Sequence, residues 1–305
     1  MSGTTKTRSA VVPSHRRGFG GCFAILAVAP AFALLALLSL PPTVGAIGLA
    51  LRNYTLRSQT SRWVGFNNFV RMWSDRRLFN ALQVSVVWEI VTVAGTMVVA
   101  ILLGTVIFER VSRRYRDLIC LALILPILLP RVSAGLIWRF MYSPLMGILN
   151  YPFTLMNLPP VEFLTRPFLA LYAVAVVDIW QWGLFFGVIM LKLLETLPPS
   201  PLEAARLDHA STWGVHWFVS LPMLRVALIT MTFVKAVESL RSFDLIYTMT
   251  GGGPGIATET LDLYAYQQGI AMSGQISYAA AMSVLLLVLS TVAFSVLFKQ
   301  TQRWR

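Results

Sequence analysis

The chain has 305 residues, of which 56% are hydrophobic and only 12% are charged. A soluble protein of this length carries about 25% charged residues, so the composition excludes an ordinary soluble enzyme and indicates a membrane protein. The formal net charge is +12, and the basic residues lie mainly between apolar segments. Membrane lipid and topology therefore explain this charge better than nucleic acid does.

Six apolar segments long enough to cross a bilayer follow one another along the chain. A basic tail at residues 1–18 precedes them, and a short tail at residues 299–305 follows them. The first segment is too long for one straight helix, and Pro41 and Pro42 are expected to kink or end it. The predicted fold class is an all-α integral membrane protein with six transmembrane helices. We expect these spans at residues 19–51, 81–108, 118–141, 167–197, 223–248 and 273–298.

Six spans place both termini on one side of the membrane. The charge pattern favours the cytoplasmic side, since the two tails and the loop at 109–117 are rich in lysine and arginine and the polar loop at 198–222, counted with Arg225, adds two more. The segment 52–80, predicted to be amphipathic and external, opposes this orientation. Its basic residues are Arg52, Arg57, Arg62, Arg71, Arg76 and Arg77.

The sequence shows none of the usual signs of catalysis. It has no phosphate-binding loop of the Walker type, no cluster with metal-ligand spacing and no paired nucleophile and base. Its two cysteines, Cys22 and Cys120, lie in apolar segments, which excludes a disulfide framework. The glycine-rich run Gly251–Gly255 is expected to form a tight external turn. We therefore predict a non-catalytic subunit that holds no cofactor or metal of its own.

The polar, helix-prone segment 203–222, EAARLDHASTWGVHWFVSLP, lies between two strongly apolar segments. It closely resembles the EAA loop of the membrane-spanning subunits of ATP-binding-cassette (ABC) importers. In that family the loop forms short cytoplasmic helices that dock into a groove on the ATPase. The family usually has glycine where this chain has His209. The residues to which the resemblance assigns coupling are Glu203, Ala204, Ala205, Asp208, His209, Ala210, Leu221 and Pro222.

Three more segments are similar to permeases of carbohydrate importers: residues 63–88, 124–150 and 248–270. The chain is identified as a member of the type I ABC carbohydrate importer permeases over about residues 19–298. It resembles the first permease of maltose, glycerol-phosphate and trehalose systems. The resemblance implies cytoplasmic termini in a bacterial inner membrane, and a sugar substrate for which a disaccharide such as trehalose is favoured. It also implies a second permease, an ATPase dimer that binds ATP and Mg, and an external solute-binding lipoprotein.

Polar residues within spans are costly and tend to be functional. Two groups stand out, one in the fourth span and one at three-residue spacing in the fifth span. One alternative is an ion-pair ladder within the fifth span, where Arg241 neutralises Glu238 and Asp244 without a ligand. For Trp182 the alternative is packing or interfacial anchoring. The predicted substrate-pathway residues are Asp178, Gln181, Trp182, Glu238, Arg241, Asp244 and Tyr247.

Two other classes of protein were weighed against the permease. An ion-coupled secondary transporter would need an internal repeat and broken helices around an ionisable pair, and the sequence shows no convincing repeat. A membrane-embedded enzyme would need a catalytic constellation, which the sequence lacks. The secondary transporter would also leave the EAA-like loop unexplained.

Overall fold

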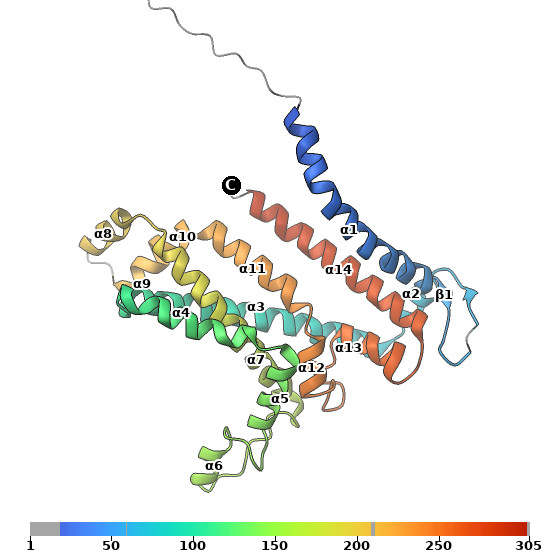
Figure 1. Cartoon of the computed structure of the whole chain (residues 1–305). Helices are drawn as coiled ribbons and strands as arrows, with labels where there is room; N and C mark the ends of the chain where they lie inside the picture. Colours follow the sequence, from blue (N-terminus) through green and yellow to red (C-terminus); the bar gives the residue numbers. More distant parts are fainter. Residues whose placement is uncertain (1–18, 59, 209–210, 304–305) are drawn as a thin grey trace, which may run out of the picture. The chain divides into compact units, whose positions relative to one another are not determined.

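The computed structural model describes residues 19–58, 60–208 and 211–303, which are mainly helical (Figure 1). Within these residues, four helices are long and apolar enough to cross a membrane: α1 (Phe19–Ala50), α3 (Arg76–Arg110), α7 (Pro167–Glu195) and α14 (Ile276–Arg303). Two sharply bent helix pairs also pass the test of length and composition, so the described residues hold four candidate spans, or up to six if each bent pair is one span, against the six that the sequence predicts.

The first bent pair joins α4 (Arg113–Leu128) to α5 (Arg131–Met141) at 93°, and the second includes α11 (Arg225–Ser239). Two short strands, β1 (Arg52–Asn53) and β2 (Arg62–Trp63), pair antiparallel before α2 (Asn67–Met72). The remaining elements are α6 (Tyr151–Leu155), α8 (Pro199–Leu207), α9 (Thr212–Val215), the π-helix η1 (His216–Ser220), α10 (Leu221–Met223), α12 (Phe243–Met249), α13 (Leu261–Tyr266) and the π-helix η2 (Gln267–Ala271).

The first span agrees closely with the predicted bounds, 19–51. Helix α1 continues through Pro30, Pro41 and Pro42 to Ala50, so of the two outcomes expected at Pro41 and Pro42, a kink or an end, the helix does not end there. Proline is tolerated inside membrane helices where local adjustments of the backbone satisfy the groups that it frees. The chain divides into two compact units, one up to Gly48 and one from Leu49 onward. The predicted tail at 1–18 lies outside the described residues, and the predicted tail at 299–305 is helical as far as Arg303.

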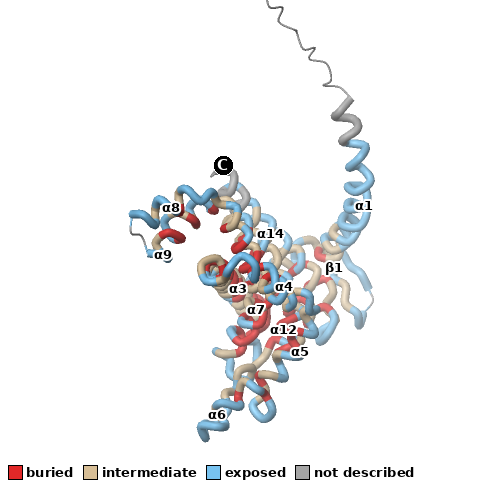
Figure 2. The backbone as a smooth tube through the Cα atoms, turned by 60° about the vertical axis from the view of Figure 1, so that its left-hand side comes forward, coloured by how far each residue is buried: buried red, intermediate tan, exposed pale blue. Residues whose placement is uncertain are grey.

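The second unit is organised around α3 and α7, which lie side by side (Figures 1 and 2). A side chain at Gly183 would place its Cβ 2.8 Å from Val99, and one at Gly187 would place it 2.7 Å from Leu103. Glycine at these two positions therefore lets the helices approach closely, as is common between membrane helices. Helix α7 is the most buried of the long helices of this unit.

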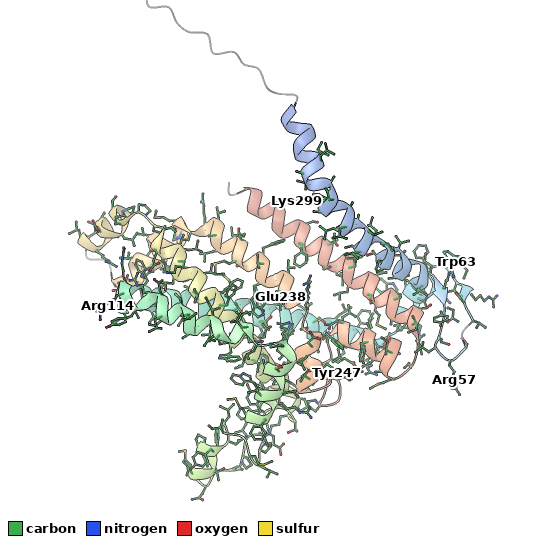
Figure 3. The ribbon with its side chains drawn as sticks, viewed as in Figure 1. Arg57, Trp63, Arg114, Glu238, Tyr247 and Lys299 are labelled. Carbon is green, nitrogen blue, oxygen red and sulfur yellow. The ribbon has the colours of Figure 1, made fainter. Side chains whose placement is uncertain are left out.

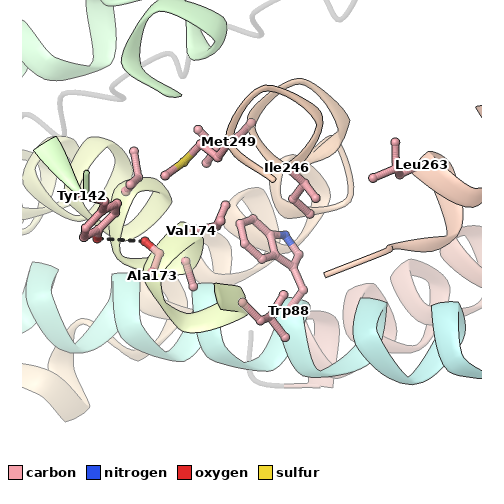
Figure 4. Packing of buried hydrophobic residues seen from close by; sticks show 11 residues of the cluster. Trp88, Tyr142, Ala173, Val174, Ile246, Met249 and Leu263 are labelled. Atoms are coloured by element: carbon pink, nitrogen blue, oxygen red, sulfur yellow. Dashed lines mark hydrogen bonds between the residues drawn. The ribbon is translucent and has the colours of Figure 1, made fainter. Parts of the chain in front are cut away.

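The largest apolar cluster lies where α7 meets α5, α12 and the first part of α3 (Figure 4). Trp88 packs against Val174 and Ile246 there, and the Tyr142 hydroxyl donates to the Ala173 carbonyl at 3.0 Å. The Trp88 indole donates to the carbonyl of Ser239, the last residue of α11, at 3.1 Å. This bond satisfies a carbonyl that the end of α11 leaves without a helical partner.

The third and fifth spans differ most from prediction, since each was expected as one helix. The third span bends at Leu129 and Pro130, because proline cannot donate the backbone bond that would continue α4. The expected fifth span, 223–248, ends as a helix at Ser239, and α12 begins separately at Phe243. The second bent pair instead joins residues 212–223 to α11 at 79°.

The second span begins earlier than predicted. Helix α3 starts at Arg76 rather than at residue 81, because the Asp75 carboxylate accepts from the backbone N–H groups of Arg77 and Leu78. The predicted external segment 52–80 therefore comprises the β1–β2 hairpin, α2 and the first turn of α3.

Candidate functional site

The predicted coupling loop folds into a run of short helices, α8 to α10. Three prolines surround the start of α8, where the missing N–H of proline costs nothing, and EAARL supplies good helix formers. Leu202 is buried beneath the helix, whereas Glu203, Ala204 and Asp208 are exposed, as expected for a docking face. Leu207 is 79% exposed on the same turn, so this face also carries an apolar side chain.

Glu109 at the end of α3 fixes the loop to the membrane helices. Its Oε1 accepts from Arg206 of α8 at 2.7 Å and lies 2.9 Å from Nε2 of His216. The other imidazole nitrogen lies 3.2 Å from the Ser220 hydroxyl, and His216 is buried. The sequence analysis did not assign a role to His216. Its place in a polar loop, next to the start of an apolar span, was the available signal.

The remaining coupling residues have mixed surroundings. Ala205 is half-buried, Leu221 packs against the cluster that includes Leu194 and Leu224, and Pro222 is exposed. His209 and Ala210 lie outside the described residues, so the roles assigned to them remain predictions from the sequence. A cavity of about 310 Å³ lies beside the loop, lined by α3 residues, including Glu109, and by Ser211 to Trp213 with His216.

Asp178 of the predicted substrate pathway is fully buried and neutralised by two cations. Its Oδ2 accepts from Lys235 Nζ of α11 at 2.6 Å, and its Oδ1 accepts from Arg131 at the start of α5. The Lys235 ammonium also lies 5.4 Å from the centre of the Trp182 ring. Asp178 therefore ties α7 to α5 and α11, and Trp182 takes part in the same cluster.

Gln181 lies one turn further along α7 and contacts the break in the third span. Its Nε2 donates to the carbonyls of Pro126 and Leu129 at 3.0 and 3.1 Å. The Pro126 carbonyl also accepts from the Leu129 N–H at 3.2 Å, and Gln181 pairs with both carbonyls at the bend, inside the bundle. Its own Oε1 is buried without a hydrogen-bond partner in the part of the chain that the structure describes.

The fifth-span residues do not form the ladder that the sequence allowed. Glu238 belongs to α11 (Figure 3), Arg241 lies in the break after it, and Asp244 lies in the first turn of α12. Within the described chain no ion pair joins any of them. The Arg241 carbonyl instead accepts from the Arg131 guanidinium, so Arg131 bridges the two helix breaks.

Tyr247 lies on α12 with half of its surface exposed. Its ring stacks on Phe243 with centroids 5.3 Å apart and meets the edge of Tyr266 at 5.6 Å. Arg241 and Asp244 are also exposed. These three residues therefore present polar and aromatic groups at one end of the break, whereas Asp178 and Gln181 are occupied by protein partners.

A network of hydrogen bonds holds the predicted external end together. The second oxygen of Asp75 accepts from the hydroxyls of Tyr264 and Tyr278 at 2.7 and 2.6 Å. Burial favours the neutral acid, but these hydrogen bonds and those from two backbone N–H groups outweigh it and lower the pKa of Asp75 below its ordinary value.

Arg77 extends this network to the glycine-rich turn. It pairs with both oxygens of Glu259 at 2.7 Å and donates to Gln267, whose amide donates to the Gly251 carbonyl. Gly251 and Gly252 have φ of 62° and 97°, a backbone region that favours glycine. The turn is thus held by side chains from three segments.

A cavity of about 690 Å³ opens beside this turn, and its lining includes Arg139 of α5, Tyr142 just after α5, residues 162–165, and Met249, Thr250, Gly253 and Pro254. Within the described residues, no group of His, Cys, Asp and Glu side chains is arranged to hold a metal ion.

Comparison with known proteins places this geometry in a family. The profile of the "binding-protein-dependent transport system inner membrane component" family matches residues 97–305. The chain is 30% identical to the lactose transport system permease protein LacF of Rhizobium radiobacter, covering 91% of this chain and 94% of that protein. It is 26% identical to the trehalose/maltose transport system permease protein MalF of Thermococcus litoralis, over 92% and 93% of the two chains.

A solved bacterial ABC transporter that imports the acidic polysaccharide alginate has the same fold, with a TM-score of 0.78 and 20% identity over 93% of this chain and 96% of its own. The molecule is therefore a membrane-spanning permease with the type I ABC importer fold. This chain belongs to the family of inner membrane components of binding-protein-dependent transport systems.

Proposed function

We propose that this chain forms one half of the translocation pathway of an ATP-driven sugar importer and is coupled to ATP hydrolysis through α8 to α10. The observation that carries the proposal is the exposed α8 face, with Glu203, Ala204 and Leu207, on a loop whose other side is fixed to α3 by Glu109. A short helix that is rigidly tied to a span and exposed on its outer side suits force transfer from a soluble partner.

The proposed assembly contains a second homologous permease, two ATPase subunits that bind ATP and Mg, and an external solute-binding lipoprotein. Both termini and the α8–α10 loop then face the cytoplasm. ATP closes the ATPase dimer, draws α8 inward and stabilises the state whose cavity opens outward, and hydrolysis restores the other state. This chain catalyses no reaction in the cycle.

The proposed substrate is a disaccharide such as trehalose. Two of the similar permeases carry trehalose/maltose and lactose in their names, and a third, 31% identical over 79% of this chain, carries sn-glycerol-3-phosphate. The exposed residues at the break after α11, with the aromatic ring of Tyr247, supply the hydroxyl-binding and stacking groups that a neutral sugar needs.

The coupling proposal is tested with Ala204→Trp in the reconstituted importer. The added indole blocks close docking of α8, so sugar-stimulated ATPase activity and uptake are expected to fall together by about tenfold or more, while the complex still purifies intact. Met156→Trp, at an exposed position after α6, is the matched control and is expected to behave as the unchanged protein does. Normal coupled transport by Ala204→Trp would contradict the proposal.

A further inference from the structure

The connection between α1 and α3, residues 51–75, joins a candidate span that ends at Ala50 to the next candidate span, which begins at Arg76. Between Arg52 and Ser74 it carries four arginines and no acidic residue, counting Arg52, Arg57, Arg62 and Arg71 in the sequence. Under the proposed orientation these cations are external, against the usual charge bias of membrane proteins. Topology therefore does not account for them.

Exposed aromatic side chains accompany these cations. Phe66, Val70 and Trp73 are 73%, 64% and 82% exposed, and their spacing of four and three residues places them on one side of α2. Trp63 on β2 is 63% exposed (Figure 3). Such an exposed group of large rings is unusual on a surface that faces only water.

The arginines divide into two sets. Arg71 and Arg77 are held by the protein: Arg71 donates to Gln275 and lies over the Tyr278 ring, and Arg77 pairs with Glu259. In the described residues, Arg52, Arg57 and Arg62 pair with no carboxylate, and Arg52 donates only to the Ser61 hydroxyl. The second set is therefore available to an external anion.

Hydrogen bonds to neighbouring elements fix the position of this segment. The Asn68 amide donates to the carbonyls of Ala50 and Arg52 at 2.7 and 2.8 Å, which ties α2 to the start of the hairpin. Tyr54 donates its backbone N–H to the Ser277 hydroxyl at 2.9 Å and accepts from the Ser277 N–H at 3.2 Å. These bonds hold the hairpin against the beginning of α14.

We propose that this surface, Arg52, Arg57, Arg62, Trp63, Phe66, Val70 and Trp73, binds the anionic headgroups of phospholipids in the leaflet next to it, which is the outer leaflet in the proposed orientation. Tryptophan rings favour the level of the headgroups, and guanidinium groups donate two parallel hydrogen bonds to a phosphate. A water-soluble partner would explain the arginines, but it would not explain the exposed aromatic rings between the end of one candidate span and the start of the next. The headgroup region of a lipid leaflet explains both the arginines and the rings.

The test measures how strongly spin-labelled phosphatidylglycerol, relative to spin-labelled phosphatidylcholine, associates with the whole importer in vesicles of phosphatidylcholine. The unchanged importer is expected to prefer phosphatidylglycerol, and added salt to reduce that preference. The double variant Arg57→Gln/Arg62→Gln is expected to lower the preference by about tenfold or more, and Arg57→Lys/Arg62→Lys to retain most of it.

Three results would overturn the proposal. One is equal association of the two lipids with the unchanged importer. This result does not depend on whether any variant folds. The second is an undiminished preference in the glutamine variant. The third is weaker binding of the solute-binding protein by the glutamine variant in vesicles of phosphatidylcholine alone, which would assign the arginines to a protein partner. None of these results bears on the coupling test with Ala204→Trp, so the two proposals fail separately.

Discussion

Among single residues, Asp178 has the largest effect on the charge balance inside the helix bundle, because its carboxylate pairs with both Lys235 and Arg131. It is fully buried between Lys235 and Arg131, so one carboxylate neutralises two cations. Removing one member of a buried ion pair is strongly destabilising because the other charge is left without a partner. Removing the Lys235 ammonium leaves the neutral Arg131–Asp178 pair, whereas removing the Asp178 carboxylate leaves two cations, so the two changes are not equivalent.

Asp178→Asn is therefore expected to destabilise the assembled importer more than Lys235→Met does. The asparagine variant removes the carboxylate that pairs with both Arg131 and Lys235, at a cost of about 3–5 kcal/mol. The methionine variant keeps the Arg131–Asp178 pair and fills the space of the lysine stem. Thermal unfolding of the two purified complexes, compared with the unchanged complex, measures the difference. The reverse order of stability would show that Lys235 and not Arg131 is the essential partner.

The sequence located these polar residues but not their partners. Asp178 and Gln181 stand out because charged and amide groups are rare inside apolar spans. Their contacts join residues 47 to 57 positions apart, and spacing along one helix cannot reveal such pairs. The sequence does contain one clue to these partners. Arg131 stands alone in a long apolar stretch, directly after Pro130, and such an isolated arginine beside a proline indicates a helix break with a buried acidic partner.

Among the elements, the spans that were predicted well are the long, uninterrupted ones, α1, α3, α7 and α14. The third and fifth spans are broken because tertiary contacts from Gln181, Arg131 and Trp88 satisfy the backbone groups that each break exposes. Apolar periodicity does not report such long-range compensation. The start of α3 differs for a local reason that the sequence does show, an aspartate at the N-cap.

The Asp75 network gives an element-scale prediction. Asp75→Asn keeps an oxygen to cap α3 but offers an amide where the Tyr264 and Tyr278 hydroxyls need an acceptor. The variant is expected to lose about 1–3 kcal/mol of stability. The folded pKa lies below the ordinary value of 3.8, so this contribution is complete above that value and is lost only as the pH falls through the folded pKa.

The measurement is thermal unfolding of both complexes at about pH 5 and about pH 8, where the difference between them is expected to be the same. Tyr264→Phe serves as the companion variant, since it removes one of the two hydroxyl donors and leaves the carboxylate intact. A difference that shrinks clearly toward the lower pH would mean that the pKa of Asp75 is raised and not lowered.

For the whole molecule, the order of spans and the position of the α8–α10 loop were predictable, because apolar spans and the EAA-like segment are both recognised from short continuous stretches of sequence. The identity of the sugar is a different kind of property. The proposed pathway is completed by a second permease, so this chain holds only part of the surface that recognises the substrate. The relatives illustrate the point, since permeases of similar sequence are named for trehalose/maltose, lactose and sn-glycerol-3-phosphate systems.

The decisive measurement is uptake of labelled trehalose, maltose and lactose into proteoliposomes that contain the complete importer, because this chain is proposed to move a sugar by coupling to ATP hydrolysis with a solute-binding partner. Uptake of at least one disaccharide is expected to require both internal ATP and the external binding protein, and an imposed proton or sodium gradient is expected to replace neither. Uptake that proceeds on an ion gradient without ATP would show that the chain is not part of an ATP-driven importer.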